Sequence, residues 1–248
     1  MLAQLYLAGS VQINGCFGFF ARYLHSTPTD KALIITAGHC AKLPRRLNVK
    51  EYAYDMNSEI PVTFLANDGS PIGTLSTSKL LYATVTGTDV ALYQLPQSFE
   101  EIMKRTDIRP LPIALKGTAP GSKIRIPTGM LAKVYECKIE AYVHQLINQD
   151  YVWSSSIRYS PEGCKMTVGT SGSPVIDLSS FEVIGLTNAG NNETDDSCMR
   201  SNVCEVSPAG TVSYRRGTSY GQQTHQIYSC LTNERKLDLN IDGCQLFH

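Results

Sequence analysis

The sequence has no long hydrophobic run and no surplus of charge of either sign. It contains no stretch of about 18 consecutive apolar residues, so we predict no membrane-spanning helix. Lysine and arginine together number 22, aspartate and glutamate also number 22, and the formal net charge is zero. A nucleic-acid-binding protein normally carries a basic surface that neutralises phosphates. We therefore expect neither a membrane partner nor a nucleic-acid partner.

Charged residues are also scarce, at 18% of the chain against about 25% in an ordinary globular domain. Apolar residues make up 42% of the 248 residues, which is enough for a large core and excludes disorder as the main state. The segment Met1–Leu5 has neither the positive start nor the apolar centre of a signal peptide, so we predict none there.

Short apolar or alternating runs recur along the chain and are rich in valine, isoleucine, tyrosine and threonine. Glycine, proline, asparagine or aspartate separates them, a pattern typical of the short antiparallel strands of β-sandwiches and β-barrels. The runs are Ser10–Ile13, Leu33–Thr36, Pro61–Leu65, Val90–Leu95, Lys123–Pro127, Ala132–Tyr142, Pro174–Ile176 and Val183–Thr187.

Only two segments favour a helix. Ser98–Arg105 opens with a plausible N-cap followed by acidic residues, and Gln226–Lys236 is the second. The proline- and glycine-rich stretch Arg105–Gly121 is interpreted as a linker between two all-β halves, residues 1–108 and 109–248. A single β domain stays possible, because sandwiches and barrels of about this length occur.

Cysteine is abundant, and its spacing excludes the commonest metal motifs. No Cys-x-x-Cys pair occurs, so we predict neither a zinc site nor a thioredoxin-type redox site. An even number of cysteines favours disulfides and an oxidising compartment, with buried free thiols as the alternative. Eight cysteines can pair in 105 ways, so spacing alone does not give the pairing. They are Cys16, Cys40, Cys137, Cys164, Cys198, Cys204, Cys230 and Cys244.

Three separated segments carry residue types that suit nucleophilic catalysis. They are Thr36–Cys40 (TAGHC), Thr88–Leu92 (TDVAL) and Gly169–Pro174 (GTSGSP). Each has an ordinary structural explanation when taken alone. A serine hydroxyl needs a neighbouring base, a carboxylate holds an imidazole base in the right tautomer, and backbone amides stabilise the oxyanion. Glycines beside a serine let the backbone approach a substrate closely. Together the segments supply all of these parts.

TAGHC, DVAL and GTSGSPV resemble the signature segments of the chymotrypsin/trypsin-like serine proteases, in the family's order. The resemblance implies an all-β chymotrypsin-like fold of two packed antiparallel six-stranded β-barrels with a short C-terminal helix. It implies His39 as general base, Asp89 as its orienting carboxylate and Ser171 as nucleophile. The oxyanion hole would be the backbone N–H groups of Gly169 and Ser171, and no cofactor is implied.

Further positions match the family. Cys16 and Cys40 resemble the disulfide that closes the histidine loop, and the remaining cysteines suggest the pairs Cys198–Cys204, Cys230–Cys244 and Cys137–Cys164. One wall of the substrate pocket is implied at Thr187, Asn188, Ala189 and Gly190, where Asn188 would either hydrogen-bond Asp89 or be purely structural.

The sequence also departs from the trypsin pattern. Thr170 stands where trypsin-like zymogens carry the aspartate that pairs with a new N-terminus, so we do not expect that activation.

GTSGSP is closer to bacterial glutamyl endopeptidases of the V8 type. Lys165 stands where trypsins have the pocket aspartate and would attract an acidic P1 side chain, unless it points into solvent. His225 is a second candidate for that role. The choice between acidic and small apolar P1 residues stays open.

Other features have ordinary interpretations. The basic clusters Lys42–Lys50 (KLPRRLNVK) and Arg215–Arg216 are interpreted as solvated loops. Asn192–Thr194 is a glycosylation sequon that matters only in a eukaryotic secretory pathway, and the acidic loop Glu193–Asp196 lacks the spacing of an EF-hand calcium loop.

The sequence thus predicts a secreted or periplasmic serine endopeptidase, a monomer acting on peptides or proteins without metal or cofactor. One alternative is a latent or catalytically silent protease-like binding protein. Another is a viral-type polyprotein protease of the same fold, which predicts free thiols in place of disulfides.

Overall fold

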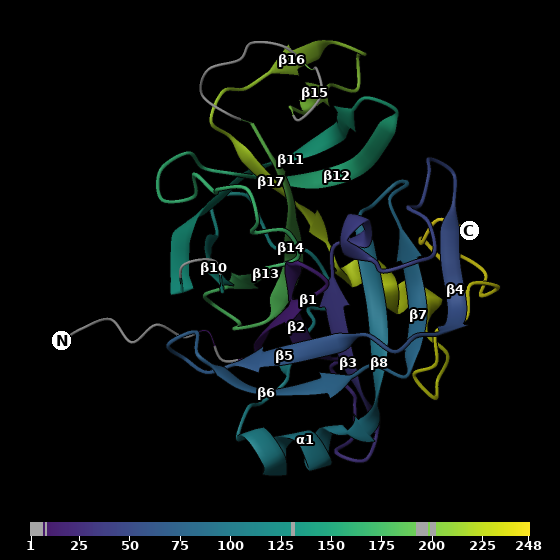
Figure 1. Cartoon of the computed structure of the whole chain (residues 1–248). Helices are drawn as coiled ribbons and strands as arrows, with labels where there is room; N and C mark the ends of the chain where they lie inside the picture. The colour runs from purple at the N-terminus through teal and green to yellow at the C-terminus, as the bar shows by residue number, and fades with distance from the viewer. Residues whose placement is uncertain (1–6, 8, 130–131, 192–197, 199–201) are drawn as a thin grey trace.

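Two antiparallel β-sheets make up most of the molecule (Figure 1). The computed structural model describes residues 7, 9–129, 132–191, 198 and 202–248. Met1–Leu5, the sequon and the acidic loop lie outside the described residues. In the first sheet the strand order is β4-β7-β8-β3-β2-β1-β5-β6, with β9 parallel to β2. Its strands are β1 (Ser10–Ile13), β2 (Cys16–Arg22), β3 (Lys31–Thr36), β4 (Tyr52–Asn57), β5 (Pro61–Leu65), β6 (Pro71–Ser76), β7 (Lys79–Thr84), β8 (Val90–Ser98) and β9 (Leu111–Pro112).

The second sheet closes on itself. Its order β10-β13-β14-β17-β12-β11 returns to the start because β11 also pairs with β10, which makes a ring of six strands. Two short strands, β15 and β16, extend the sheet beyond β11. The strands are β10 (Lys123–Thr128), β11 (Lys133–Asn148), β12 (Tyr151–Tyr159), β13 (Pro174–Asp177), β14 (Val183–Gly190), β15 (Cys204–Val206), β16 (Val212–Tyr214) and β17 (Ser219–Gln223).

The chymotrypsin-like all-β architecture is confirmed, but its two halves differ from the predicted pair of closed barrels. The second half holds the six-stranded ring. The first sheet has nine strands, and within the described residues no pairing joins β4 to β6, so it is a half-barrel. Burial explains the fold locally: in β3 every residue after Lys31 is buried, as expected for a strand covered on both faces.

Each sheet encloses an apolar core. The larger core lies mainly in the first half, where it contains aromatic residues such as Phe19, Phe20 and Tyr93, and it extends to Leu186 of β14 and Ile227 of η3 (His225–Cys230). The smaller core lies inside the ring and includes Ile124, Tyr159 and Val175. The described segment between residues 107 and 122 joins the sheets and is itself packed, since Ile113 donates its N–H to Arg22 of β2 and pairs with Val183 of β14.

One predicted helix is confirmed and the other is wrong. Helix α1 (Phe99–Thr106) begins after Ser98, whose hydroxyl accepts the Glu101 N–H while the Glu101 carboxylate accepts the Ser98 N–H. In place of a helix over Gln226–Lys236 there is only the short 3₁₀ helix η3 (His225–Cys230). The chain turns back after it, because Leu231 pairs with Leu237 and Cys230 is bonded to Cys244.

All eight cysteines form disulfides, in the pairs Cys16–Cys40, Cys137–Cys164, Cys198–Cys204 and Cys230–Cys244. The four predicted pairings are confirmed. Such density of disulfides is typical of proteins in oxidising compartments. Among the described residues, no helix is long and apolar enough to cross a membrane.

Candidate active site

His39 and Asp89 meet at neighbouring strand ends. His39 lies in η1 (Gly38–Cys40), just after β3, and Asp89 lies just before β8, which pairs antiparallel with β3. The His39 ring Nδ1 lies 2.7 Å from Asp89 Oδ2, and the His39 backbone N–H donates to Asp89 Oδ1 at 2.8 Å. The Asp89 side chain is fully buried, whereas 41% of the His39 side chain is exposed. The carboxylate therefore holds the imidazole ring by its Nδ1 atom, while part of the His39 side chain stays accessible.

The charges around His39 make it a stronger base. Burial lowers the pKa of His39, but the charge of Asp89 and its hydrogen bond act the other way, and the net result is a raised pKa. The positive charge of Arg46 opposes part of this increase in pKa. An imidazole that is stabilised in its protonated form by a buried carboxylate is suited to accept a proton from a weak acid such as a serine hydroxyl.

Ser171 lies in a tight turn that only glycine permits on its C-terminal side. Gly172 has φ +83°, and a Cβ atom there would lie 2.0 Å from the Phe17 carbonyl oxygen. Phe17 donates its N–H to the Ser171 carbonyl at 3.0 Å, and Gly172 donates to the Thr187 carbonyl at 2.8 Å. The turn is thus held between β2 and β14, and its position depends on both sheets.

The backbone ahead of Ser171 is available to a ligand. Gly169 has φ +94°, and within the described residues neither its N–H nor that of Ser171 has an acceptor. The Thr170 hydroxyl donates to the Thr167 carbonyl at 3.0 Å, and the Thr187 hydroxyl donates to the Thr170 carbonyl at 2.6 Å. These bonds hold the turn without the aspartate that trypsin-like zymogens have at this place.

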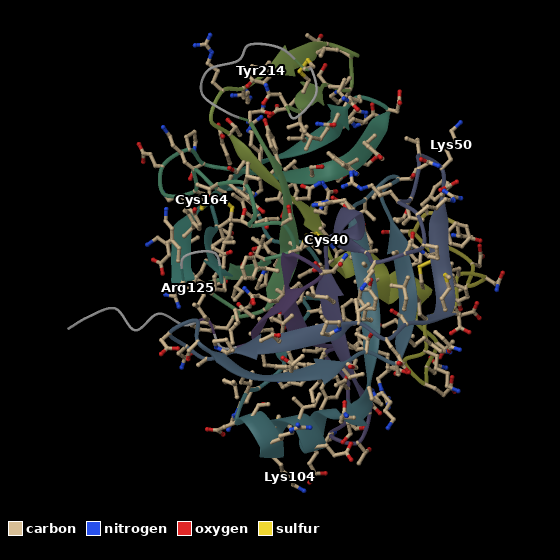
Figure 2. The ribbon with its side chains drawn as sticks, viewed as in Figure 1. Cys40, Lys50, Lys104, Arg125, Cys164 and Tyr214 are labelled. Carbon is tan, nitrogen blue, oxygen red and sulfur yellow. A yellow bond between two sulfur atoms is a disulfide. The ribbon has the colours of Figure 1, made fainter. Side chains whose placement is uncertain are left out.

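A cleft of about 1060 Å³ contains both His39 and Ser171 in its walls. No hydrogen bond joins their side chains in the described structure, and catalytic hydrogen bonds of this kind often tighten only in the complex with substrate. Figure 2 shows Cys40, the neighbour of His39, close to the place where the two sheets meet. The lining residues are Gly38, His39, Ala41, Arg46, Leu47, Val85, Asn148, Tyr151, Trp153, Met166, Thr167, Val168, Gly169, Thr170, Ser171, Thr187, Asn188, Ala189, Gly190, Asn191 and Asn202.

The structure brings most of the predicted site residues into this cleft. The segment 187–190 lines it together with Gly169 and Ser171, while Asp89 is buried behind His39. Lys165 is exposed and lies outside the described lining, and so does His225. Of the two alternatives for Asn188, the hydrogen bond to Asp89 is absent: the buried nitrogen and oxygen of the Asn188 amide have no hydrogen-bond partner among the described residues.

Several lining residues were not found by the sequence analysis. Tyr151 and Trp153 come from β12, and their parallel rings lie 6.2 Å apart between centroids. Arg46 and Leu47 come from the basic cluster that was interpreted as a solvated loop. The only sequence signal for Trp153 was that it is the one tryptophan of the chain.

One cluster of metal-ligand types lies at the site. The ligand atoms of Cys16, His39 and Cys40 lie within 4.8 Å of one another. Both sulfur atoms belong to the Cys16–Cys40 disulfide and offer no thiolate to a metal. This set therefore does not fit a metal centre.

The family model for the trypsin-like peptidase domain matches residues 18–186. The chain belongs to the trypsin-like peptidase family. This match spans β2 to β14 and includes the segments that carry His39, Asp89 and Ser171. The narrower resemblance to glutamyl endopeptidases stays a prediction.

Solved structures agree with the family in fold. The MamO protease domain from Magnetospirillum magneticum superimposes with a TM-score of 0.56 at 14% identity, covering 94% of this chain and 100% of that one. The Rv3671c protease from M. tuberculosis, in its active form, gives 0.52 at 14% identity, with coverage of 96% and 82%. No curated protein sequence matches this chain. At such low identity the similarity establishes the fold alone.

Proposed function

We propose that this trypsin-like peptidase is a serine endopeptidase that cleaves peptide bonds through an acyl-enzyme on Ser171. The observation that carries the proposal is the shared cleft, which is lined both by Ser171 and by His39, held by the buried Asp89. In this proposal residues 1–108 supply the base and its carboxylate, and residues 109–248 supply the nucleophile.

The chemistry follows from the groups in the cleft. His39 Nε2 accepts the Ser171 hydroxyl proton as Oγ attacks the scissile carbonyl, and the unpaired N–H groups of Gly169 and Ser171 bind the oxyanion. The imidazolium, stabilised by Asp89, then gives its proton to the leaving amine. Water attacks the resulting ester with His39 again as base, which releases the acid and restores Ser171. Every proton is returned, and no metal or cofactor is needed.

The four disulfides support a secreted or periplasmic location. They argue against the viral-type alternative, which predicts free thiols. We expect the protein to act as a monomer on peptide or protein substrates.

The test is covalent labelling with a fluorophosphonate, which reacts with activated serines. Wild-type protein is expected to be labelled at one site, Ser171→Ala is expected to be inert, and the exposed-serine variant Ser213→Ala serves as the matched control. If folded wild-type protein, checked by near-ultraviolet circular dichroism, is not labelled, the proposal fails and the silent binding protein is favoured.

A further inference from the structure

The loop between η1 and β4 contributes to the cleft. Within residues 41–51, Ala41, Arg46 and Leu47 line the cleft that also contains His39, and Arg46 is exposed. Its neighbour Arg45 is also exposed but does not line the cleft. The loop therefore presents one of its two adjacent guanidinium groups to the site.

The two arginines also differ in their partners. Arg45 donates two hydrogen bonds to the Glu51 carboxylate, at 2.6 Å and 2.9 Å. Arg46 has no ion pair within the part of the chain that the structure describes. A bidentate pair uses the geometry in which a guanidinium binds a carboxylate best, so Arg45 is already satisfied. Arg46 keeps this capacity for a ligand.

The described lining of the cleft carries permanent charge of one sign only, which is positive. Among the described lining residues Arg46 alone carries a permanent charge, and no carboxylate lines the wall, since Asp89 is buried behind His39. The amides Asn148, Asn188 and Asn191 and the apolar residues leave this positive charge uncompensated. A cleft with one sign of charge attracts the opposite charge and rejects the same one.

Arg46 shares the cleft with His39 and also acts on it electrostatically. Its positive charge opposes the increase in the pKa of His39, so the two groups lie within electrostatic range. Two charged groups act on His39: Asp89, which is hydrogen-bonded to its ring, and Arg46, which lies in the loop between η1 and β4. Cys40, the next residue in the chain, is disulfide-bonded and does not titrate. Because Arg46 lines the same cleft as His39 and Ser171, a peptide bound there can place an acidic side chain at Arg46 while its scissile bond lies at Ser171.

We propose that Arg46 forms a subsite that binds an acidic side chain of the substrate, glutamate or aspartate, next to the scissile bond. Leu47 beside it offers apolar surface to the methylene groups of that side chain. This specificity replaces the one expected from Lys165, which lies outside the lining. It rests on the proposed function insofar as the bound peptide is a substrate.

Binding and cleavage are measured separately, so that the two proposals fail in different ways. The probes are fluorescein-labelled octapeptides in which one of the four central positions is glutamate, glutamine or lysine and the others are mixed uncharged residues. Binding is measured by anisotropy on the Ser171→Ala variant, and cleavage by mass spectrometry on protein with Ser171 intact. Each assay is repeated with Arg46→Gln and with the matched control Arg45→Gln.

At one position we expect glutamate to bind about fivefold more tightly than glutamine, as for a moderately exposed ion pair, and lysine to bind more weakly. Arg46→Gln removes this preference, Arg45→Gln keeps it, and 1 M salt weakens it. In the cleavage assay, Arg46→Gln should also shift the acidic limb of the pH profile of kcat/KM to higher pH. The shift is expected because loss of the positive charge of Arg46 raises the pKa of His39.

Equal binding of glutamate and glutamine peptides at all four positions would overturn the subsite, as would equal loss of preference in both arginine variants. Acidic preference in binding without any cleavage would leave the subsite in place and refute the endopeptidase.

Discussion

At the scale of single residues, His39 depends on Asp89 in two ways. The carboxylate accepts one hydrogen bond from the imidazole ring and another from the His39 backbone, so it sets both the orientation of the ring and the path of η1. Because Asp89 is fully buried, water weakens neither bond. The same carboxylate raises the pKa of His39 against the effect of burial.

This arrangement predicts the pH dependence of activity. His39 accepts a proton only when it is neutral, so kcat/KM should fall as the pH drops through a pKa above the ordinary imidazole value of about 6.5. Asp89→Asn should lower kcat by on the order of 10⁴-fold and lower the pKa of His39, measured from the NMR titration of its ring protons. Asp55→Asn, which removes the exposed partner of Lys79, is the control and should change neither. An unshifted His39 titration in Asp89→Asn would contradict the role given to Asp89.

At the scale of elements, the hairpin of β11 and β12 ties the ring to the first sheet. Trp153 donates its indole N–H to the Val85 carbonyl at 3.0 Å. Gly87 donates its N–H to Val152 at 3.0 Å and accepts from Ser154 at 2.8 Å. These three hydrogen bonds join the hairpin to Val85 and Gly87, which lie just before Asp89 in the chain. The hairpin therefore helps to fix both the cleft lining at Trp153 and the position of the Asp89 carboxylate.

Removing the indole N–H tests this connection. Trp153→Phe leaves the buried Val85 carbonyl without its donor, which should cost about 1–3 kcal/mol of stability and raise KM. Tyr52→Phe, which removes the hydroxyl of an exposed ring outside the cleft lining, is the control and is expected to change neither quantity. Denaturant midpoints and steady-state kinetics measure both. If the two variants behave alike, the bond to Val85 does not support the site.

At the scale of the whole molecule, the disulfides divide into those near the site and those far from it. Cys16–Cys40 joins β2 to η1 beside His39, while Cys230–Cys244 folds the C-terminal tail back. The tail then covers the first sheet, where Tyr54 donates to Leu237 at 2.8 Å and Tyr82 donates to Phe247 at 2.7 Å. Figure 1 shows this tail running beside β4 and β7.

Removal of each pair should therefore have different consequences. Replacing both Cys230 and Cys244 by alanine opens a loop with a sequence separation of 14 and should lower the free energy of unfolding by about 3 kcal/mol while fluorophosphonate labelling persists. Replacing both Cys16 and Cys40 should reduce stability and labelling together, because η1 loses its covalent support. Unfolding curves and labelling rates distinguish the two, and unimpaired labelling without Cys16–Cys40 would contradict this role.

Much of the fold was predictable because its signals are local. The alternating pattern of Ser10–Ile13 and the capping residues Ser98 and Glu101 depend on neighbours a few positions away, and the structure has these elements where they were expected. The helix expected near residue 230 was wrong because a distant cysteine, Cys244, turns the chain back. Closure of the ring also rests on a non-local pair, β10 with β11.

The sequence by itself determined the family and the chemistry on offer, since a histidine, an aspartate and a glycine-flanked serine are recognisable from short segments. Only the tertiary structure decided which other side chains share the cleft. Lys165 is close to Ser171 in the chain but lies outside the lining, whereas Arg46 and Trp153, far away in sequence, are inside it. The reason is physical: cleft walls form where two sheets meet, and their packing and strand register are set by contacts between residues far apart in the chain.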